Sequence, residues 1–339
     1  MAAPSTAGWG DGPRGGSSGG SSGGSSRPPG LRQISLARIA EFGIEPKRRL
    51  GQNFLIDDNI IGVILDRLAP TPADVAIEVG AGLGILTQAL AAATLSVHAF
   101  EIDRSLRPAL EATLADAGVR ERVHLEYSDI MRVSLEDLRP TPTLCASNLP
   151  YSIAAPFLGE ALERLPSIRR YCVMTQREVA ERLGSPPGSK AYGAPSVWVQ
   201  LHARILETRP LSRTIFHPQP NVDSSLITLE RAVADPLVTE YPRLLRAVVE
   251  GAFQQRRKLA LNSLSAVLGV EKVLLAEVLT RAGLAPGVRP EQMVPAAFVE
   301  VARALVELGL AGRYNESHDR AGADRLHEEG AKKSGRRSR

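Results

Sequence analysis

The sequence contains few of the residues that stabilise small secreted proteins or bind metals. Only two of its 339 residues are cysteines, Cys145 and Cys172, and each lies in an apolar run typical of a strand. Isolated thiols in such runs predict reduced, buried side chains rather than a disulfide or a metal site. The six histidines are scattered without the spacing of a zinc site, so we expect no bound metal.

Long apolar segments are also missing. No run approaches the roughly 18 apolar residues that a membrane-spanning helix needs. Residues 1–30 contain no apolar stretch of the kind found in secretory signals. We therefore expect no contact with a membrane, and we predict a cytoplasmic protein.

Positive charge is concentrated at the two ends of the chain. Of the formal net charge of +4, residues 1–30 contribute +1 and residues 313–339 contribute +3, so the middle is close to neutral. Binding of a nucleic acid would therefore depend on local clusters rather than on a basic fold. Two such clusters are present, and either could be only a solvated surface: Lys47-Arg48-Arg49 and Arg256-Arg257-Lys258.

Between its polar ends the chain alternates strand-like and helix-like runs. Strands are predicted at residues 75–79, 97–102, 123–127, 143–147, 170–175, 204–208 and 225–230. Helices are predicted at residues 83–93, 106–117, 153–165 and 176–183, and later at 241–253, 258–268, 270–282 and 295–308. The first part is typical of a mostly parallel sheet with helices on both faces, and the part after residue 236 is helical only.

These patterns divide the chain into four parts. Residues 1–36, rich in glycine and serine, are predicted to be a disordered tail because they cannot bury enough apolar surface to fold. Residues 37–233 are predicted to form an α/β domain, and residues 234–311 a small helical domain. Residues 312–339 are predicted to be a second disordered tail, which is basic.

A glycine-rich turn joins the first predicted strand to its helix, in the stretch from Glu78 to Gly84. Its glycines, Gly80, Gly82 and Gly84, have G-x-G-x-G spacing. Dinucleotide sites use G-x-G-x-x-G instead, so the turn favours a nucleoside ligand without a pyrophosphate. Ligands of open α/β sheets lie at the carboxyl ends of the strands, where this turn is placed.

Acidic residues end the next two predicted strands. Glu101 and Asp103 follow the second strand, where a carboxylate can accept hydrogen bonds from the two hydroxyls of a ribose. Asp129 follows the third strand, where it could accept a hydrogen bond from an adenine amino group. One acid at a strand end is more often a helix cap, but this succession predicts a nucleoside site.

The tetrapeptide Asn148-Leu149-Pro150-Tyr151 follows the fourth predicted strand. The side chain of Asn148 offers a carbonyl oxygen, and Pro150 leaves the Leu149 carbonyl free and rigidly oriented. The ring of Tyr151 offers a stacking face for a base. We predict that the two oxygens accept hydrogen bonds from an exocyclic amino group and orient its lone pair toward an electrophile.

Several motifs, in order and with compatible spacing, give the chain its resemblance to a known family. They are residues 47–55 (KRRLGQNFL), the glycine turn, Glu101-Ile102-Asp103, Asp129, the tetrapeptide, residues 176–179 (QREV), 189–193 (SKAYG), 216–224 (FHPQPNVDS) and 253–258 (FQQRRK). From about residue 38 to residue 309 the chain resembles the bacterial small-subunit ribosomal RNA adenine N6,N6-dimethyltransferases, the kasugamycin-sensitivity methyltransferase family.

The resemblance implies a fold and a cofactor. The fold would be that of class I S-adenosylmethionine-dependent methyltransferases, with a Rossmann-like, mostly parallel seven-stranded sheet and a small C-terminal all-helical domain. The methyl donor would be S-adenosyl-L-methionine, and the residues lining its site would be Asn53, Leu55, Gly80, Gly82, Glu101, Asp129 and Asn148. Residues 37–233 would then be the catalytic domain, and residues 234–311 would bind RNA.

The resemblance also implies a substrate. This is a pair of adjacent adenines in a hairpin near the 3′ end of 16S rRNA, within a partly assembled small subunit, with a monomeric enzyme. The target base must leave its stack, and Phe216 is a candidate second stacking face, although a core aromatic is about as probable. Both basic clusters could contact phosphates. His217 is not needed as a base, because the methylated nitrogen is acidic enough to release its proton to solvent.

Two other functions are compatible with the same residues. A related enzyme that methylates 23S rRNA and confers macrolide resistance shares the tetrapeptide and the glycine turn. The stretch Lys190-Ala191-Tyr192-Gly193 and the Arg256-Arg257-Lys258 helix favour the small-subunit enzyme instead. A non-catalytic RNA-binding assembly factor is the other alternative, and the presence of Asn148 and Glu101 favours catalysis over it.

Overall fold

The computed structural model describes residues 31–255 and 258–314. The strands are β1 (Phe54–Leu55), β2 (Val75–Val79), β3 (Ser96–Phe100), β4 (Val123–Glu126), β5 (Leu144–Asn148), β6 (Arg170–Gln176), β7 (Ala203–Leu211), β8 (Phe216–His217) and β9 (Ser224–Arg231). The helices are α1 (Leu31–Glu41), α2 (Asp58–Leu68), α3 (Ile85–Ala93), α4 (Arg107–Asp116), α5 (Ala154–Arg164), α6 (Arg177–Gly184), α7 (Ala194–His202), α8 (Pro236–Glu240), α9 (Pro242–Phe253), α10 (Ala260–Leu268), α11 (Lys272–Arg281) and α12 (Pro295–Glu307).

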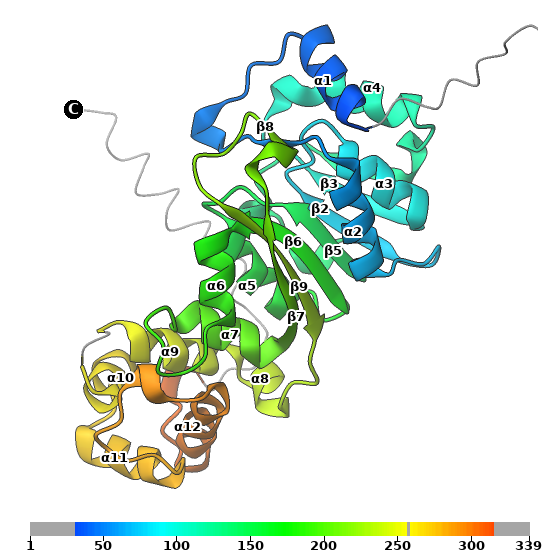
Figure 1. Ribbon diagram of the computed structural model, residues 1–339. Coiled ribbons are helices and arrows are strands. Elements are labelled where there is room, and N and C mark those ends of the chain that lie inside the picture. Colours follow the sequence, from blue (N-terminus) through cyan, green and yellow to red (C-terminus); the bar gives the residue numbers. More distant parts are fainter. Residues whose placement is uncertain (1–30, 256–257, 315–339) are drawn as a thin grey trace, which may run out of the picture.

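Seven strands form one sheet in the order β4-β3-β2-β5-β6-β9-β7 (Figure 1). Strands β4, β3, β2, β5 and β6 are parallel, and β9 is antiparallel to both β6 and β7. The predicted mostly parallel seven-stranded sheet is therefore confirmed. Strand β7 forms one edge of the sheet, and its pairing with β9 shifts register between Ile205 and Glu207.

Helices cover both faces of the sheet because its central strands are apolar on both sides. In β2, Ala76 packs into the core with α2, α3 and α4, whereas Ile77 and Val79 pack on the opposite face with α5 and α6. Alternate residues of one strand point to opposite faces, so each continuous apolar strand supplies two cores. This packing holds the central strands in place, so that the carboxyl ends of the parallel strands lie together at one end of the sheet.

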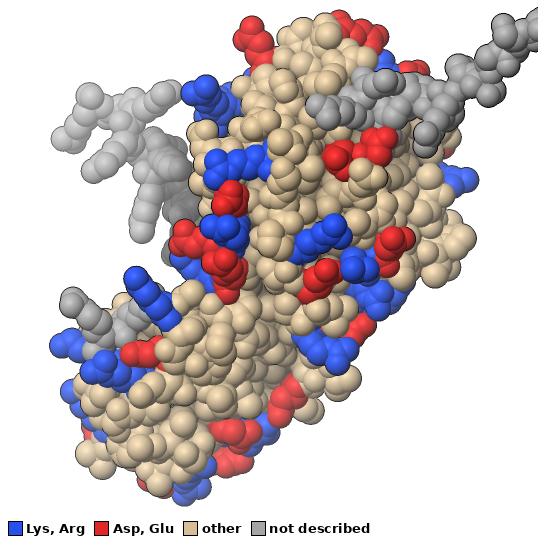
Figure 2. Space-filling model, viewed as in Figure 1, with Lys and Arg blue, Asp and Glu red and all other residues tan. Residues whose placement is uncertain are grey.

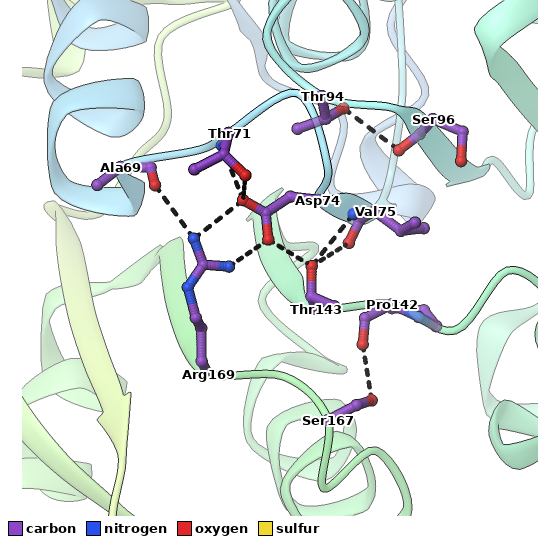
Figure 3. A network of polar contacts seen from close by, with 10 residues as sticks. All are labelled: Ala69, Thr71, Asp74, Val75, Thr94, Ser96, Pro142, Thr143, Ser167 and Arg169. Carbon is purple, nitrogen blue, oxygen red and sulfur yellow. Dashed lines mark hydrogen bonds and ion pairs between the residues drawn. The ribbon is translucent and has the colours of Figure 1, made fainter.

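A polar network closes the opposite edge of the sheet, at the amino ends of β2 and β6 (Figure 3). The carboxylate of Asp74, 7% exposed, accepts hydrogen bonds from Thr71, Thr143 and Arg169. Arg169 also donates to the carbonyl oxygen of Ala69, at the end of α2. Burial alone would raise the pKa of Asp74, but these hydrogen bonds outweigh it and lower the pKa to about 2.

The C-terminal helices form a separate apolar core with α7 (Figure 1). This core contains α8 to α12 and also Tyr192 and Trp198, which belong to the segment before β7. The hydroxyl of the fully buried Tyr192 donates to the carbonyl oxygen of Met293 over 2.8 Å. The predicted helices near residues 241–308 are present, while the domain boundaries at residues 233 and 311 stay predictions.

The structure corrects the predicted N-terminal tail. Residues 31–36, placed in that tail, belong to α1, and Ser35 is fully buried and donates to the carbonyl oxygen of Leu55. Ile34 and Ile39 pack against the core, so this segment does bury apolar surface. Residues 312–314, placed in the second tail, form a 3₁₀ turn, and Tyr314 packs against the helical core. Residues 1–30 and 315–339 lie outside the described part of the chain.

Several short elements were not predicted, namely α1, α2, α7, α8, β1 and β8. A signal for α2 was available in the sequence. Asp57 caps this helix by accepting from the backbone N–H groups of Asn59 and Ile60, and Ile60, Ile64 and Leu68 recur along its buried face. None of the described helices is both long enough and apolar enough to cross a bilayer.

Candidate active site

A cavity of about 420 Å³ opens at the carboxyl ends of β2, β3, β4 and β5. Its lining combines the glycine turn after β2, the acids after β3 and β4, and the tetrapeptide after β5. The segment before β1 adds the remaining wall. The lining residues used below are Arg48, Arg49, Gln52, Asn53, Phe54, Gly80, Gly82, Glu101, Ile102, Asp129, Asn148, Leu149, Pro150 and Tyr151.

The glycine turn allows two segments of backbone to approach closely. Gly80 has a φ of 79°, a region that side chains disfavour, and an added Cβ would lie 3.3 Å from the carbonyl oxygen of Asn148. An added Cβ at Gly82, where φ is 55°, would lie 3.3 Å from the ring of Phe54. Because Gly80 and Gly82 have no side chains, this wall of the cavity stays open, and the backbone of the tetrapeptide can lie close to the glycine turn.

Glu101 connects the glycine turn to the end of β3. Its two carboxylate oxygens accept hydrogen bonds from the backbone N–H groups of Gly82 and Asp103, each over 2.8 Å. Burial raises the pKa of Glu101, while these hydrogen bonds oppose the shift. A carboxylate has about four acceptor positions, so unused positions remain toward the cavity that it lines.

Asp129 lines the cavity after β4, as its predicted role requires. One oxygen caps the 3₁₀ turn Ile130–Arg132 by accepting from the backbone N–H of Met131 over 3.1 Å. The other oxygen lies 3.7 Å from the guanidinium of Arg132, whose side chain is 85% exposed. The capping alternative is thus real, and it leaves the second oxygen available to a ligand.

The amide of Asn148 is held by the segment on the other side of the cavity. Its Nδ2 donates to the carbonyl oxygen of Asn53 over 2.9 Å, 95 residues away in the chain. Because the nitrogen is committed there, the Oδ1 acceptor faces another direction. We call the two acceptors predicted to orient the amino lone pair, Asn148 Oδ1 and the Leu149 carbonyl oxygen, the clamp. The clamp needs Asn148 Oδ1, and the contact with Asn53 fixes which end of the Asn148 amide remains available to a ligand.

Leu149 and Tyr151 complete the tetrapeptide. Leu149 is buried and its N–H donates to Met174 on β6, while no described backbone N–H donates to its own carbonyl oxygen. The hydroxyl of Tyr151 lies 3.0 Å from the hydroxyl of Ser224 on β9, which anchors the ring beside the cavity. The structure therefore brings together Asn148, Leu149, Pro150 and Tyr151 as predicted, but their roles stay predictions.

Leu55 lies deeper than the other predicted cofactor residues. It belongs to β1, which pairs with β8 so that Leu55 faces Phe216 in the ladder. Leu55 lines a second, smaller cavity of about 30 Å³ behind the glycine turn, together with Glu78 and Asn148. Glu78 is 1% exposed, and no described group gives its Oε2 a hydrogen bond.

The predicted stacking role of Phe216 does not fit its position. Its ring is 3% exposed, packs into the core with α2 and α3, and does not line the cavity. Pairing of β8 with β1 turns the side chain inward, which favours the alternative of a core aromatic. A base could reach this ring only after the β1–β8 pair had opened.

The first basic cluster divides into two kinds of residue. Arg48 and Arg49 are exposed, line the cavity, and form no ion pair with a described residue. Lys47 instead donates to Asp103 over 2.7 Å and to Ser105 over 2.6 Å. Its charge is therefore compensated inside the protein, and contact with RNA phosphates stays a prediction only weakly supported for Lys47.

The second basic cluster lies mostly outside the described residues. Nothing is placed for Arg256 and Arg257, while Lys258 is exposed just before α10. On the face seen in Figure 2, basic and acidic side chains intermingle along the middle of the molecule and leave wide uncharged areas. No charge of one sign dominates that face, which agrees with the near-neutral middle of the chain.

The structure adds two lining residues that were not predicted to act. Ile102 is 52% exposed although apolar, and it lines the cavity between Glu101 and Asp103. An apolar residue that remains exposed beside a cavity offers a surface for a flat ligand ring. Gln52 lines the cavity and donates to Asp103. The signal for Ile102 was its position between two acids at a strand end.

Comparison with known proteins agrees with this geometry. The family model described as ribosomal RNA adenine dimethylase matches residues 44–299, which include every cavity-lining residue named above. The chain belongs to the ribosomal RNA adenine dimethylase family. The protein is therefore an enzyme of the methyltransferase class, as expected from the tetrapeptide and the glycine turn.

Named relatives cover most of the chain. The chain is 40% identical over 277 residues to the "Ribosomal RNA small subunit methyltransferase A" of Streptomyces avermitilis, covering 81% of this chain and 92% of the relative. It is 35% identical over 277 residues to the protein of that name from Bacillus cytotoxicus, covering 79% and 94%.

Two solved structures share the fold of this chain. A dimethyladenosine transferase from Plasmodium falciparum matches with a TM-score of 0.65 at 20% identity, covering 76% of this chain and 98% of that one. The 23S rRNA methyltransferase ErmE matches with a TM-score of 0.55 at 24% identity, covering 75% and 100%. At these identities the likeness concerns the fold alone.

Proposed function

We propose that this protein uses S-adenosyl-L-methionine to dimethylate the N6 amino groups of two adjacent adenines in a hairpin near the 3′ end of 16S rRNA. The observation that carries the proposal is the orientation of the Asn148 amide, whose nitrogen is committed to Asn53 while its oxygen remains an acceptor. Relatives that are 35–40% identical and named as small-subunit methyltransferases support the choice of RNA.

The residues present suit S-adenosylmethionine. The cavity of about 420 Å³ lies within the range of roughly 300–1,000 Å³ typical of small-molecule sites. Gly80 leaves the space that a side chain would fill, and Glu101 retains acceptor positions for hydroxyl groups. We propose that Asn53, Gly80, Gly82, Glu101, Asp129 and Asn148 hold this cofactor, with Leu55 supporting them from β1. When bound, S-adenosylmethionine supplies a methyl group activated on a sulfonium.

The tetrapeptide would orient the target nitrogen. The lone pair of an adenine amino group is delocalised into the ring, so the nitrogen is a poor nucleophile. Hydrogen bonds accepted by Asn148 Oδ1 and the Leu149 carbonyl oxygen would favour a tetrahedral nitrogen with its lone pair toward the methyl group. Tyr151 would stack on the base, and Pro150 would keep the loop rigid. The alkylated nitrogen then loses its proton to solvent, so no side chain has to act as a base.

We further propose that the enzyme acts as a monomer in the cytoplasm on partly assembled small subunits. Residues 37–233 would hold the cofactor and the base. Residues 234–311 would contact RNA around the target, together with Arg48, Arg49 and Lys258. The identity to small-subunit relatives favours this substrate over 23S rRNA, because the match to the 23S enzyme ErmE supports the fold alone.

Labelled S-adenosylmethionine and immature small subunits provide the test. We expect label in two adjacent adenines near the 3′ end of 16S rRNA, with dimethyladenosine as the final product. Isolated large subunits serve as the matched substrate control. Label in 23S rRNA would identify the related activity, and binding of small subunits without any transfer would identify an assembly factor.

A further inference from the structure

The cavity is covered on one side by a short segment, residues 47–54, which we call the strap. It contains the 3₁₀ turn η1 (Arg48–Leu50), and Gly51 then reverses the chain with a φ of 65°. Residues 48–54 line the cavity. Phe54, at the C-terminal end of the strap, pairs with His217 in the β1–β8 ladder, whereas residues 47–53 make no described backbone–backbone hydrogen bond to another segment. The position of residues 47–53 therefore depends on side chains.

One carboxylate holds the strap at two points, Lys47 and Gln52. Asp103 Oδ1 accepts from Lys47 Nζ over 2.7 Å, and Asp103 Oδ2 accepts from Gln52 Nε2 over 2.7 Å. Lys47 and Gln52 also bind each other, since the backbone N–H of Lys47 donates to Gln52 Oε1 over 2.7 Å. These three residues form a closed ring of contacts, in which each one restrains the other two.

Asp103 is built to be an anchor. It is 5% exposed, and its Oδ1 also accepts from the N–H and the hydroxyl of Ser105 over 3.1 and 2.7 Å, so four protein groups in all donate to this carboxylate. It does not line the cavity, whereas its neighbours Glu101 and Ile102 do. A buried carboxylate that is held by four protein groups and lies off the cavity is suited to a role within the protein itself.

The strap in turn holds the clamp. The residue after Gln52 is Asn53, whose carbonyl oxygen accepts from the amide of Asn148 over 2.9 Å. A shift of the strap would release that amide and allow it to rotate. The chain of contacts therefore runs from Asp103 through Gln52 and Asn53 to Asn148, across three segments that are far apart in sequence.

We propose that Asp103 is a positioning residue that latches the strap over the cofactor cavity and thereby fixes the orientation of the Asn148 amide. The inference rests on the proposed methyl transfer, but the latch itself is a property of the protein that can be measured without RNA. It assigns Lys47 to this latch, and leaves Arg48 and Arg49 exposed at the mouth of the cavity that they line.

Trypsin provides a direct test, because Arg48 and Arg49 lie in the strap and are exposed. In the full-length protein, we expect Asp103→Asn to accelerate cleavage after Arg48 and Arg49 roughly 10-fold, as followed by mass spectrometry, because charge-assisted hydrogen bonds are lost. The matched control is Asp235→Asn. Asp235 also caps a helix and pairs with an arginine, Arg303, far along the chain, so cleavage of the strap should not change.

Cofactor binding provides the second measurement. We expect Asp103→Asn to weaken the affinity for S-adenosylmethionine roughly 10-fold without RNA, and to lower the rate of transfer at saturating cofactor. The rate at saturating cofactor separates a role in orientation from simple loss of binding. Saturation fills the site of a variant that only binds the cofactor more weakly, but it does not correct a misoriented Asn148 amide. Lys47→Met should reproduce both effects while leaving Asp103 as the cap of the 3₁₀ turn Arg104–Leu106, and the double variant should be no worse than the single ones.

The outcomes are distinguishable. If the parent protein binds S-adenosylmethionine and both variants retain its affinity and its cleavage rate, the latch is wrong. If the parent protein neither binds the cofactor nor methylates small subunits, the proposed function fails, and the cleavage rates alone decide the latch. Should Asp103→Asn unfold, Lys47→Met decides in its place, with thermal unfolding as the control for both.

Discussion

The orientation of one amide is the residue-scale feature on which the proposed chemistry depends. Asn148 has a donor and an acceptor at the same end of its side chain, and Asn53 takes the donor. A carboxylate at this position would offer two acceptors but would place an oxygen against the Asn53 carbonyl. The side chain must therefore be an amide for both contacts to be satisfied.

We predict that Asn148→Ala lowers methyl transfer to small subunits at least about 100-fold, the scale seen when one preorganised hydrogen-bonding group is removed from an active site. Asn148→Asp should be intermediate, since it keeps an acceptor and loses the contact with Asn53. Methyl incorporation measures both rates, and thermal unfolding checks that each variant is folded. A near-normal rate for Asn148→Ala would remove this residue from the mechanism.

A second residue-scale prediction concerns Glu78, which lies behind the glycine turn. Burial, with no described partner for Oε2, raises the pKa of Glu78 to about 8. Below about pH 4.5 the Glu78 carboxyl is protonated in both the folded and the unfolded protein, so its titration does not lower the free energy of unfolding there. As the pH rises toward 8 the unfolded state ionises first, and the free energy of unfolding falls.

Glu78→Gln should therefore stabilise the protein more at pH 8 than at pH 5. Urea denaturation at the two pH values measures the difference in free energy of unfolding between variant and parent. An equal difference at both pH values would show that this carboxyl titrates normally in the folded protein. The result bears on the small cavity that Glu78 shares with Leu55 and Asn148.

At the scale of elements, the network around Asp74 is the clearest structural device. It joins the loop after α2 to the starts of β2, β5 and β6, at the edge of the sheet away from the cavity (Figure 3). It therefore aligns the strands whose opposite ends supply the glycine turn and the tetrapeptide. Loss of the Asp74 network should therefore lower the free energy of unfolding more than it lowers the rate of methyl transfer.

We predict that Asp74→Ala lowers the free energy of unfolding by about 2–3 kcal/mol, because buried acceptors for charged and hydroxyl donors are lost. The parent should also lose up to about 2 kcal/mol as the pH falls from 4 toward 2. The sign follows from the lowered pKa of about 2, since stability gained above the ordinary pKa disappears as the folded carboxylate is protonated. Chemical denaturation of parent and variant along this pH range is the measurement, and parallel curves would contradict it.

The elements also show what sequence could and could not predict. The strands β2, β5 and β6 follow from short apolar runs, and the glycine turn and acids follow from their places after them. The β1–β8 pair could not be predicted, because each strand has two residues and their partners lie about 160 positions apart. That pair buries Phe216, which favours the alternative of a core aromatic, and the stacking role stays a prediction.

The contacts by which Asp103 holds the strap could not be predicted from the sequence for a similar reason. Lys47 and Asp103 are 56 residues apart, and a basic triplet in sequence carries no sign of which member is paired in the fold. Local signals therefore identified the residues that line the cavity, whereas long-range ion pairs decide which charges remain free. The residues of the clamp were predictable, but the contact that orients the clamp was not.

At the scale of the whole molecule, the face seen in Figure 2 is not uniformly basic, so we expect any RNA contact on it to rely on a few unpaired cations. Arg48 and Arg49 are exposed at the cavity and form no ion pair with a described residue, whereas Lys47 does. We predict that Arg48→Ala and Arg49→Ala each reduce the salt slope of small-subunit binding by about 0.7–0.9 per lost phosphate contact.

Lys47→Met is the matched comparison, and it should leave that salt slope unchanged. Filter binding or fluorescence anisotropy over a salt series gives the slopes. A reduced slope for Lys47→Met, with unchanged slopes for the two arginine variants, would reverse the assignment.

The edge strand β7 also affects whether the protein associates with itself at high concentration. An open edge offers unpaired N–H and C=O groups to any passing strand, the usual start of aggregation. Here that edge has exposed charges at Arg204 and Arg209, a register shift at Ile205, and Pro210, which has no N–H to donate. These features oppose addition of a strand from a neighbouring molecule at β7, so this edge of the sheet, one of two, is protected against fibre-like self-association.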